Sequence, residues 1–240
     1  MDRGAQTSFS LPGLPGVEVA LRRSARARRM TLRVGRADGR VTLTLPPRQD
    51  LAEARRFAES HAAWIAAQVE AAPSPRRISV GGAVPLLGRE TPVVAGGGRA
   101  ARLQGGAIAV PEDERAGPRV KALFQTLART HLAAAVDRHA ARLGKTPGAL
   151  TLRDTRSRWG SCSSRGDLMF SWRLVMAPEA VLDYVAAHEV AHLAHMDHSQ
   201  RFWAEVEGLM PDYARRRDWL RREGAALHAI DFAAGHEARA

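Results

Sequence analysis

The sequence lacks most of what marks an exported or membrane-bound protein. Cys162 is its only cysteine, which excludes a disulfide within the chain and suits a reducing compartment. No apolar run is long enough to span a bilayer, and residues 1–16 contain no apolar segment of the kind that a signal peptide requires. We therefore expect a cytoplasmic protein with no membrane segment, in which residues 1–16 form a flexible lead.

The chain also has few lysines, although it is strongly basic. Lys121 and Lys145 are the only lysines among 36 basic residues, and the net charge is +11. The abundance of arginine and alanine is typical of a coding bias, but the arginines gather at 22–29 and 215–222. We interpret these Arg-rich surfaces as solvated faces, and nucleic-acid binding through them stays open as an alternative.

The 240 residues are enough for one large core or two small lobes. Residues 17–112 have the pattern of a β-rich α+β lobe with no obvious chemistry of its own. Within it the apolar spacing predicts strands at 17–21, 30–34 and 41–45, a helix over 50–69, and short strands between 78 and 110.

A second lobe is predicted over residues 118–226. Its patterns are a long helix at 119–143, strands near 150–153, 159–162 and 168–172, and helices that begin near Pro178, Ser199 and Asp212. We expect the last helix to end at Gly224 and residues 227–240 to form a flexible tail. The fold class that follows is α+β.

Residues 187–198 contain the pattern on which the functional hypothesis rests. His188-Glu189-x-x-His192 places two imidazoles one turn apart on the same apolar face of a predicted helix. A buried imidazole pair is costly without a partner, whereas a metal ion satisfies both nitrogens. Three protein ligands with one open position are the arrangement of a catalytic zinc site, so the first hypothesis is a zinc hydrolase.

The third ligand has several candidates. His195 continues the helical face, but three ligands on one straight helix do not easily converge on one ion. His198 follows a predicted turn, and we prefer it. Glu205 or Glu207 on the following segment is the alternative that a carboxylate-containing zinc site would need.

Several further motifs occur in order along the chain and resemble the YgjP-like metallopeptidase family. The resemblance covers most of residues 18–224, including the first hairpin and the helix of Trp64. The chain departs from the family at Asp197, which usually is asparagine, and at Val190, which usually is leucine. The motifs are Arg156-Ser157-Arg158-Trp159-Gly160-Ser161-Cys162-Ser163, Ser171-Trp172-Arg173-Leu174, Ala177-Pro178, Asp183-Tyr184-Val185, His188-Glu189-x-x-His192-Leu193, Asp197-His198-Ser199, Phe202-Trp203, and Pro211 with Trp219-Leu220.

This resemblance implies a zincin-like catalytic domain, which combines a small antiparallel sheet with the H-E-x-x-H helix. It implies His188, His192 and His198 as zinc ligands and Glu189 as the catalytic carboxylate. The family is also similar to the SprT-like proteases, which act on proteins attached to DNA, and this likeness keeps the basic charge of interest.

The chemistry of such a site suggests roles for further residues. Glu189 would take a proton from the zinc-activated water and pass it to the leaving amine. We expect an extended peptide to pair with an edge strand formed by residues 159–163, and Arg158 or Tyr213 to stabilise the oxyanion. A structural role for Arg158 and Trp159, in packing that strand on the metal helix, is equally open.

We therefore expect a zinc metallopeptidase that acts on a peptide or protein substrate. One alternative is a metal-dependent hydrolase of nucleotides or other phosphoanhydrides, which would hold phosphates with the Arg-rich surfaces. Another is a basic nucleic-acid-binding module with a structural metal, against which Glu189 argues because a structural site does not need it. The sequence makes no prediction of the oligomeric state.

Overall fold

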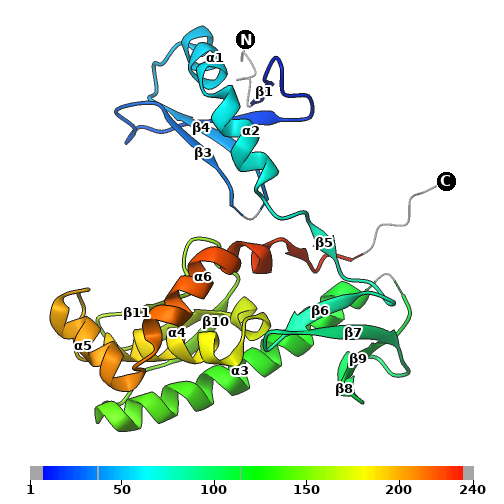
Figure 1. Ribbon diagram of the computed structural model, residues 1–240, viewed down its shortest axis with the longest axis vertical. Coiled ribbons are helices and arrows are strands. Elements are labelled where there is room, and N and C mark those ends of the chain that lie inside the picture. The colour runs from blue at the N-terminus through cyan, green and yellow to red at the C-terminus, as the bar shows by residue number, and fades with distance from the viewer. Residues whose placement is uncertain (1–7, 37, 114, 235–240) are drawn as a thin grey trace. The chain divides into compact units, whose positions relative to one another are not determined.

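The computed structural model describes residues 8–36, 38–113 and 115–234, and the chain divides into two compact units, Met1–Pro75 and Arg76–Ala240 (Figure 1). Each unit has a buried core of its own and mixes helices with small sheets, so the predicted α+β class is confirmed. The observed division differs from the expected lobe over 17–112, because Val84 and Ile108 belong to the same core as Phe124.

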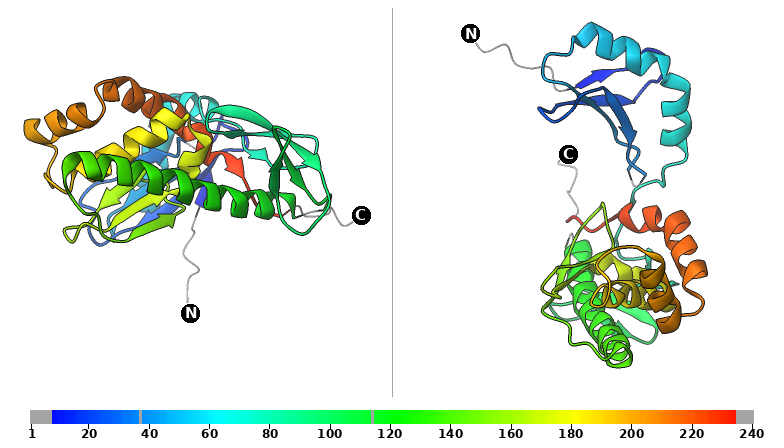
Figure 2. Two further views of the ribbon diagram at one scale, coloured as in Figure 1. Left: turned by 90° about the horizontal axis from the view of Figure 1, so that it is seen from below. Right: turned by 90° about the vertical axis from the view of Figure 1, so that its left-hand side faces the viewer.

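The first unit is a four-stranded sheet with two helices on one face (Figure 2). Val41, Leu43 and Leu45, at alternate positions of one strand, are buried against these helices. The predicted hairpin is confirmed, because β3 and β4 pair antiparallel, and the strand order is β1-β2-β4-β3. The elements are β1 (Ser8–Ser10), β2 (Glu18–Arg23), β3 (Thr31–Val34), β4 (Val41–Leu45), α1 (Leu51–Ser60) and α2 (Ala62–Glu70).

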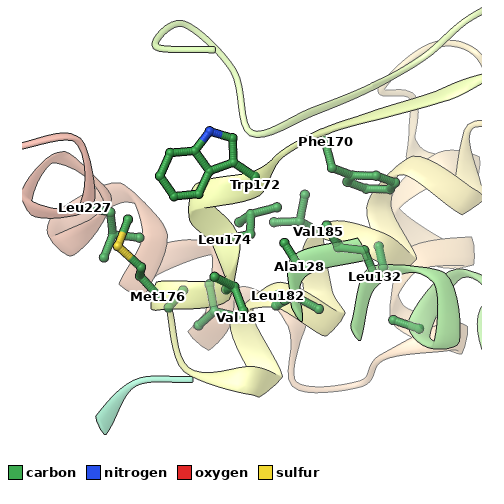
Figure 3. Close-up of a cluster of buried hydrophobic side chains, with 14 of the residues drawn as sticks. Ala128, Leu132, Phe170, Trp172, Leu174, Met176, Val181, Leu182, Val185 and Leu227 are labelled. Atoms are coloured by element: carbon green, nitrogen blue, oxygen red, sulfur yellow. The ribbon is translucent and has the colours of Figure 1, made fainter. Parts of the chain in front are cut away.

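The second unit is organised along its longest helix, α3 (Figure 2). Ala128 and Leu132 of this helix belong to the same buried core as Phe170, Trp172 and Val185, which Figure 3 shows. The elements are β5 (Arg76–Arg77), β6 (Ala83–Leu86), β7 (Arg89–Ala95), β8 (Arg102–Gln104), β9 (Ala107–Val110), α3 (Ala116–Leu143), β10 (Leu150–Arg153), β11 (Gly160–Cys162), β12 (Leu168–Ser171), the 3-10 helix η1 (Trp172–Met176), α4 (Glu179–Ala191), α5 (Gln200–Leu209), α6 (Tyr213–His228) and β13 (Ile230–Asp231).

The two ends of the described chain are ordered where flexible segments were expected. β1 pairs with β2 and buries Phe9, so residues 8–10 do not belong to a flexible lead. Near the other end β13 pairs with β5, and the Phe232 ring lies 5.0 Å from that of Trp172, measured between centroids. Residues 1–7 and 235–240 of the expected lead and tail lie outside the described residues.

Two helix boundaries also differ from expectation. The single helix predicted over 50–69 is interrupted at His61. There the Ser60 hydroxyl and the His61 ring both bond to the carbonyl of Phe57, to which the backbone N–H of His61 would bond in a continuous helix. The last helix runs past Gly224 to His228. Gly224 lies against the indole of Trp159, where a Cβ would stand 3.0 Å from Cζ2, so this glycine permits close packing and does not end the helix.

A three-stranded sheet lies beside the H-E-x-x-H helix. Its order is β10-β12-β11, so β11 is an edge strand, as expected for residues 159–163. β11 pairs antiparallel with β12, with Gly160 opposite Phe170, and it contacts α4. An edge strand beside the helix that carries the motif agrees with the zincin-like expectation. The sheet itself is mixed and not antiparallel throughout, because β10 pairs parallel with β12. None of the described helices combines the length and apolar character needed to cross a bilayer.

Candidate metal centre

The motif lies at the end of a buried helix. α4 begins after Pro178 with Glu179 in its first turn, where a carboxylate opposes the positive end of the helix dipole. His188 and His192 are one turn apart on this helix, and their ring centroids are 5.1 Å apart. His192 is the C-cap residue, so the chain leaves the helix directly after the second imidazole.

The turn after α4 brings a third imidazole back to this face. The Asp197 carboxylate accepts the backbone N–H of Ser199 at 3.2 Å, which fixes the bend before α5. His198 then lies over the first two rings, 5.2 Å from His188 and 4.8 Å from His192 between centroids.

The three imidazoles have the geometry of a metal site. One ring nitrogen from each of His188, His192 and His198 lies within 4.8 Å of the others, and the Nε2 atoms of His188 and His198 are 3.3 Å apart. In a tetrahedral zinc site with bonds of about 2.05 Å, two ligand nitrogens are about 3.4 Å apart. These residues therefore fit a zinc ion or another small divalent cation.

Protonation of the rings favours the same reading. The Nδ1 atom of His192 lies 2.9 Å from the carbonyl oxygen of His195, which only accepts, so Nδ1 carries the proton and Nε2 is left as a ligand atom. Burial lowers the pKa of His188 to about 3 and also lowers that of His192. Neutral imidazoles are the form that binds metals.

Aromatic rings from α5 hold the imidazoles in place. Phe202, which is fully buried, stacks on His192 with centroids 4.4 Å apart and an angle of 25° between the planes. Trp203 stacks on His198 at 5.9 Å. The sequence analysis counted Phe202-Trp203 among the family motifs but gave the pair no role in the site.

Glu189 lies between the metal face and the edge strand. Its side chain is buried, and a Cβ added to Gly160 of β11 would stand 2.5 Å from its Oε1 atom. Burial raises the pKa of Glu189 to about 8, and the charge of Arg158 opposes this rise. A carboxylate with a high proton affinity therefore lies next to the strand that is open for pairing.

The other predicted site residues lie in different surroundings. His195 contributes its carbonyl to His192, and its ring is not part of the histidine group. Glu205 and Glu207 lie on α5, and among the described residues neither belongs to a group of three or more close metal-binding side chains. The alternative carboxylate ligand therefore has no geometric support, whereas His198 has.

The two candidates for the oxyanion each interact with a different residue of the site. Arg158 is exposed, and its charge acts on Glu189. Tyr213 begins α6 and stacks on Trp203 at 5.4 Å with an angle of 20°. The guanidinium of Arg217 also lies over Trp203, 4.7 Å from its centroid, and its charge lowers the pKa of His188. Sequence reasoning missed Arg217, since it is one of five arginines between 215 and 222.

The class of this chain follows from its match to a protein-family model. The model of the family described as YgjP-like, metallopeptidase domain, matches residues 28–223, which is most of the chain. The chain therefore belongs to the YgjP-like metallopeptidase family, as its motifs predicted.

Other comparisons add little to this assignment. The chain is similar to a solved structure, the metallopeptidase zymogen abylysin of Pyrococcus abyssi, with 23% sequence identity and a TM-score of 0.34. That likeness covers 38% of this chain and 93% of the other. No curated protein matches the chain.

Proposed function

We propose that the protein is a zinc metallopeptidase in which His188, His192 and His198 hold the metal and Glu189 is the general base. The observation that carries the proposal is the meeting of three imidazole nitrogens within 4.8 Å of one another beside a buried carboxylate. Three neutral imidazoles that leave one position open are a common ligand set of catalytic zinc. A purely structural site would not need Glu189.

Glu189 would move the protons of the reaction. A zinc ion, when bound, supplies Lewis acidity, which activates water for attack and polarises the substrate carbonyl. Glu189 takes the proton of the attacking water and delivers it to the leaving nitrogen as the peptide bond breaks. Burial raises the pKa of Glu189 to about 8, and the positive charge of a bound metal ion would lower it toward neutral pH, where the carboxylate can accept a proton.

The edge strand β11 would bind the substrate. One side of β11 pairs with β12, and the other side carries no strand among the described residues. An extended peptide that pairs there lies alongside Glu189, because Gly160 has no side chain to separate them. Arg158 precedes this strand by two residues, and Tyr213 stacks on Trp203 next to the histidines. We propose that one of them binds the oxyanion.

The Arg-rich surface of α6 supports the phosphoanhydride alternative less well than the site supports peptide hydrolysis. Three of its arginines form ion pairs: Arg216 with Asp212, which is the N-cap residue of the helix, and Arg221 and Arg222 with Asp218. These pairs reduce the charge that is available to a nucleotide or a nucleic acid. Peptide and protein substrates therefore remain the substrate class that we propose. We also propose that the protein is located in the cytoplasm, since a single cysteine suits a reducing compartment.

The test is Glu189→Gln, with Glu205→Gln as the matched control on α5. We expect Glu189→Gln to retain about one zinc per chain by elemental analysis and to lose hydrolysis of denatured casein by at least about a hundredfold. Glu205→Gln should retain both the zinc content and the casein hydrolysis of the native protein. ATP turnover is assayed in parallel, and ATP hydrolysis that depends on Glu189 without casein cleavage would replace the proposal with the phosphoanhydride alternative.

Full casein cleavage by Glu189→Gln would remove Glu189 as the general base. A native chain that takes up no zinc would remove the metal centre.

A further inference from the structure

The first unit contains a groove that the metal centre does not involve. It lies between the edge strand β3 and the helices α1 and α2, and its volume is about 440 Å³. Apolar and aromatic side chains line most of it, namely Met30, Leu32, Phe57, His61 and Trp64. The break between the two helices at His61 places Phe57 and Trp64 on either side of that residue, so both helices contribute to one wall.

The backbone of β3 is open along this groove. The N–H of Gly35 bonds to the carbonyl of Arg40 at 2.9 Å, so 35 and 40 form a hydrogen-bonded pair. In an antiparallel ladder such pairs alternate, and Arg33 with Thr42 is the next one. Leu32 and Val34 therefore direct their backbone N–H and C=O groups away from β4, toward the side where no described strand lies.

The groove also exposes a large apolar side chain. Trp64 is 44% exposed, one of only four large hydrophobic side chains of the described residues that are open to this degree. Its neighbours Phe57 and His61 contact each other with ring centroids 4.5 Å apart. An indole held at the rim of a groove, next to an unpaired strand edge, is the setting in which an extended chain gains both backbone bonds and apolar contact.

The positive charge around the groove favours an acidic ligand. Arg29 lines it, no carboxylate does, and Arg28 is exposed next to it in the loop that enters β3. Neither arginine has an ion-pair partner among the described residues. Residues 8–75 contain eleven arginines and six carboxylates, so the unit as a whole favours an acidic ligand.

We propose that the first unit binds an extended peptide by strand addition to β3. The peptide carries a large apolar residue, which enters the groove beside Trp64, and acidic residues on either side of it, which meet Arg28 and Arg29. Binding at this groove does not depend on the metal centre or on the proposed peptidase activity.

The probe is a fluorescein-labelled peptide with a Leu-Phe-Leu core and two glutamates on each side. It is titrated into the full chain carrying Glu189→Gln, so that cleavage does not remove it, and binding is followed by fluorescence anisotropy. We expect saturable binding that weakens at least about tenfold when alternate backbone amides of the peptide are methylated, because strand addition needs those N–H groups. The same core flanked by lysines should not bind.

Hydrogen exchange gives the geometry of the complex. The amides of Leu32 and Val34 should become protected when the peptide binds, whereas those of Thr31 and Arg33, which face β4, should change little. Trp64→Ala and Arg29→Glu should each weaken binding about tenfold. Arg48→Glu is the control of matched charge, since Arg48 is exposed in the same unit and does not line the groove.

Three outcomes would overturn the proposal. One is no binding of the glutamate-flanked peptide, or binding that backbone methylation does not affect. Another is tighter binding of a single-stranded oligonucleotide that is lost in Trp64→Ala, which would assign the groove to nucleic acid. The third is protection of Leu32 and Val34 without peptide, accompanied by dimers in sedimentation, which would show that β3 pairs with a second copy.

Discussion

Gly160 of the edge strand lies against the carboxylate of Glu189, so closely that a Cβ at this position would stand 2.5 Å from Oε1 and 2.6 Å from Cγ. Gly160→Ala therefore forces either the strand or the carboxylate to move. Because a shift of about 1 Å in a catalytic group costs about a hundredfold in rate, we expect casein hydrolysis to fall by that factor. Zinc content should stay at that of the native protein.

Gly208 provides the control for this substitution. It lies in α5, and a Cβ there would meet nothing within 4 Å. Gly208→Ala should leave hydrolysis unchanged and raise the free energy of unfolding by about 0.5–1 kcal/mol, since alanine favours the helix. Unchanged activity in Gly160→Ala would contradict the role of this close approach.

Substitution of His198 should weaken zinc binding, whereas substitution of His195 should not. His198→Ala removes one of three converging nitrogens, and we expect the affinity for zinc to fall by at least about a thousandfold. His195→Ala should keep about one zinc per chain, because only its backbone carbonyl contacts the site. Elemental analysis after dialysis distinguishes the two, and equal loss in both variants would refute the ligand assignment.

Phe202 should tune the metal affinity without binding the metal. Phe202→Leu keeps most of the buried volume but removes the ring that stacks on His192. We expect zinc affinity to fall about tenfold, because the imidazole is less well oriented, with a loss of about 1 kcal/mol in stability. Competition with a chelating dye measures the affinity.

The matched control for Phe202 is Phe124→Leu. Phe124 is also fully buried, but it packs against Phe232 and contacts no histidine of the site. This variant should lose similar stability and keep the zinc affinity. Equal affinities in the two variants would show that Phe202 is a core residue only.

Asp183 should make the stability of the second unit depend on pH. His139 Nε2 and Arg138 Nη2 each lie 2.9 Å from its Oδ1. Burial raises the pKa of this carboxyl, but the bonds from His139 and Arg138 outweigh it, so the pKa lies below the usual value. A pKa that is lower in the folded state stabilises the protein above pH about 4, and this contribution is lost as the pH falls through the folded pKa.

The corresponding variant is Asp183→Asn. It should lower the free energy of unfolding by about 1 kcal/mol at pH 7, since the carboxylate is partly solvated, and by less at pH 3. Urea unfolding at both pH values measures the difference. Asp137→Asn, at an exposed position of α3, is the control and should change the free energy of unfolding at neither pH. Equal losses at both pH values would mean that Asp183 acts through shape alone.

Local patterns predicted much of this fold. Alternating apolar residues located the hairpin of β3 and β4, and the helical spacing around His188 and His192 located α4. These features depend on neighbours in the sequence. The boundary between the units does not, because the strands between Ala83 and Val110 join the core of α3 through contacts that are far apart in the chain.

The site was predictable to the extent that its residues follow one another in the motif. The preference for His198 matches the observed convergence of the three imidazoles, but the assignment of ligands stays a prediction. Phe202, Trp203 and Arg217 were not predicted as site residues, because an apolar pair on a helix and an arginine among arginines have many more common roles. Only the return of the chain after α4 gives them a place beside the metal centre.

The pairing of β5 with β13 brings the first and last described strands of the second unit together, with Ile230 opposite Arg76 and Asp231 opposite Arg77. In evolutionary terms, a unit whose ends meet can be transferred between proteins at a single insertion point without rebuilding its interior. Gly160, Glu189, the three histidines and Tyr213 all lie between these strands in the sequence. The candidate centre would therefore be inherited as one set, whatever the unit is joined to.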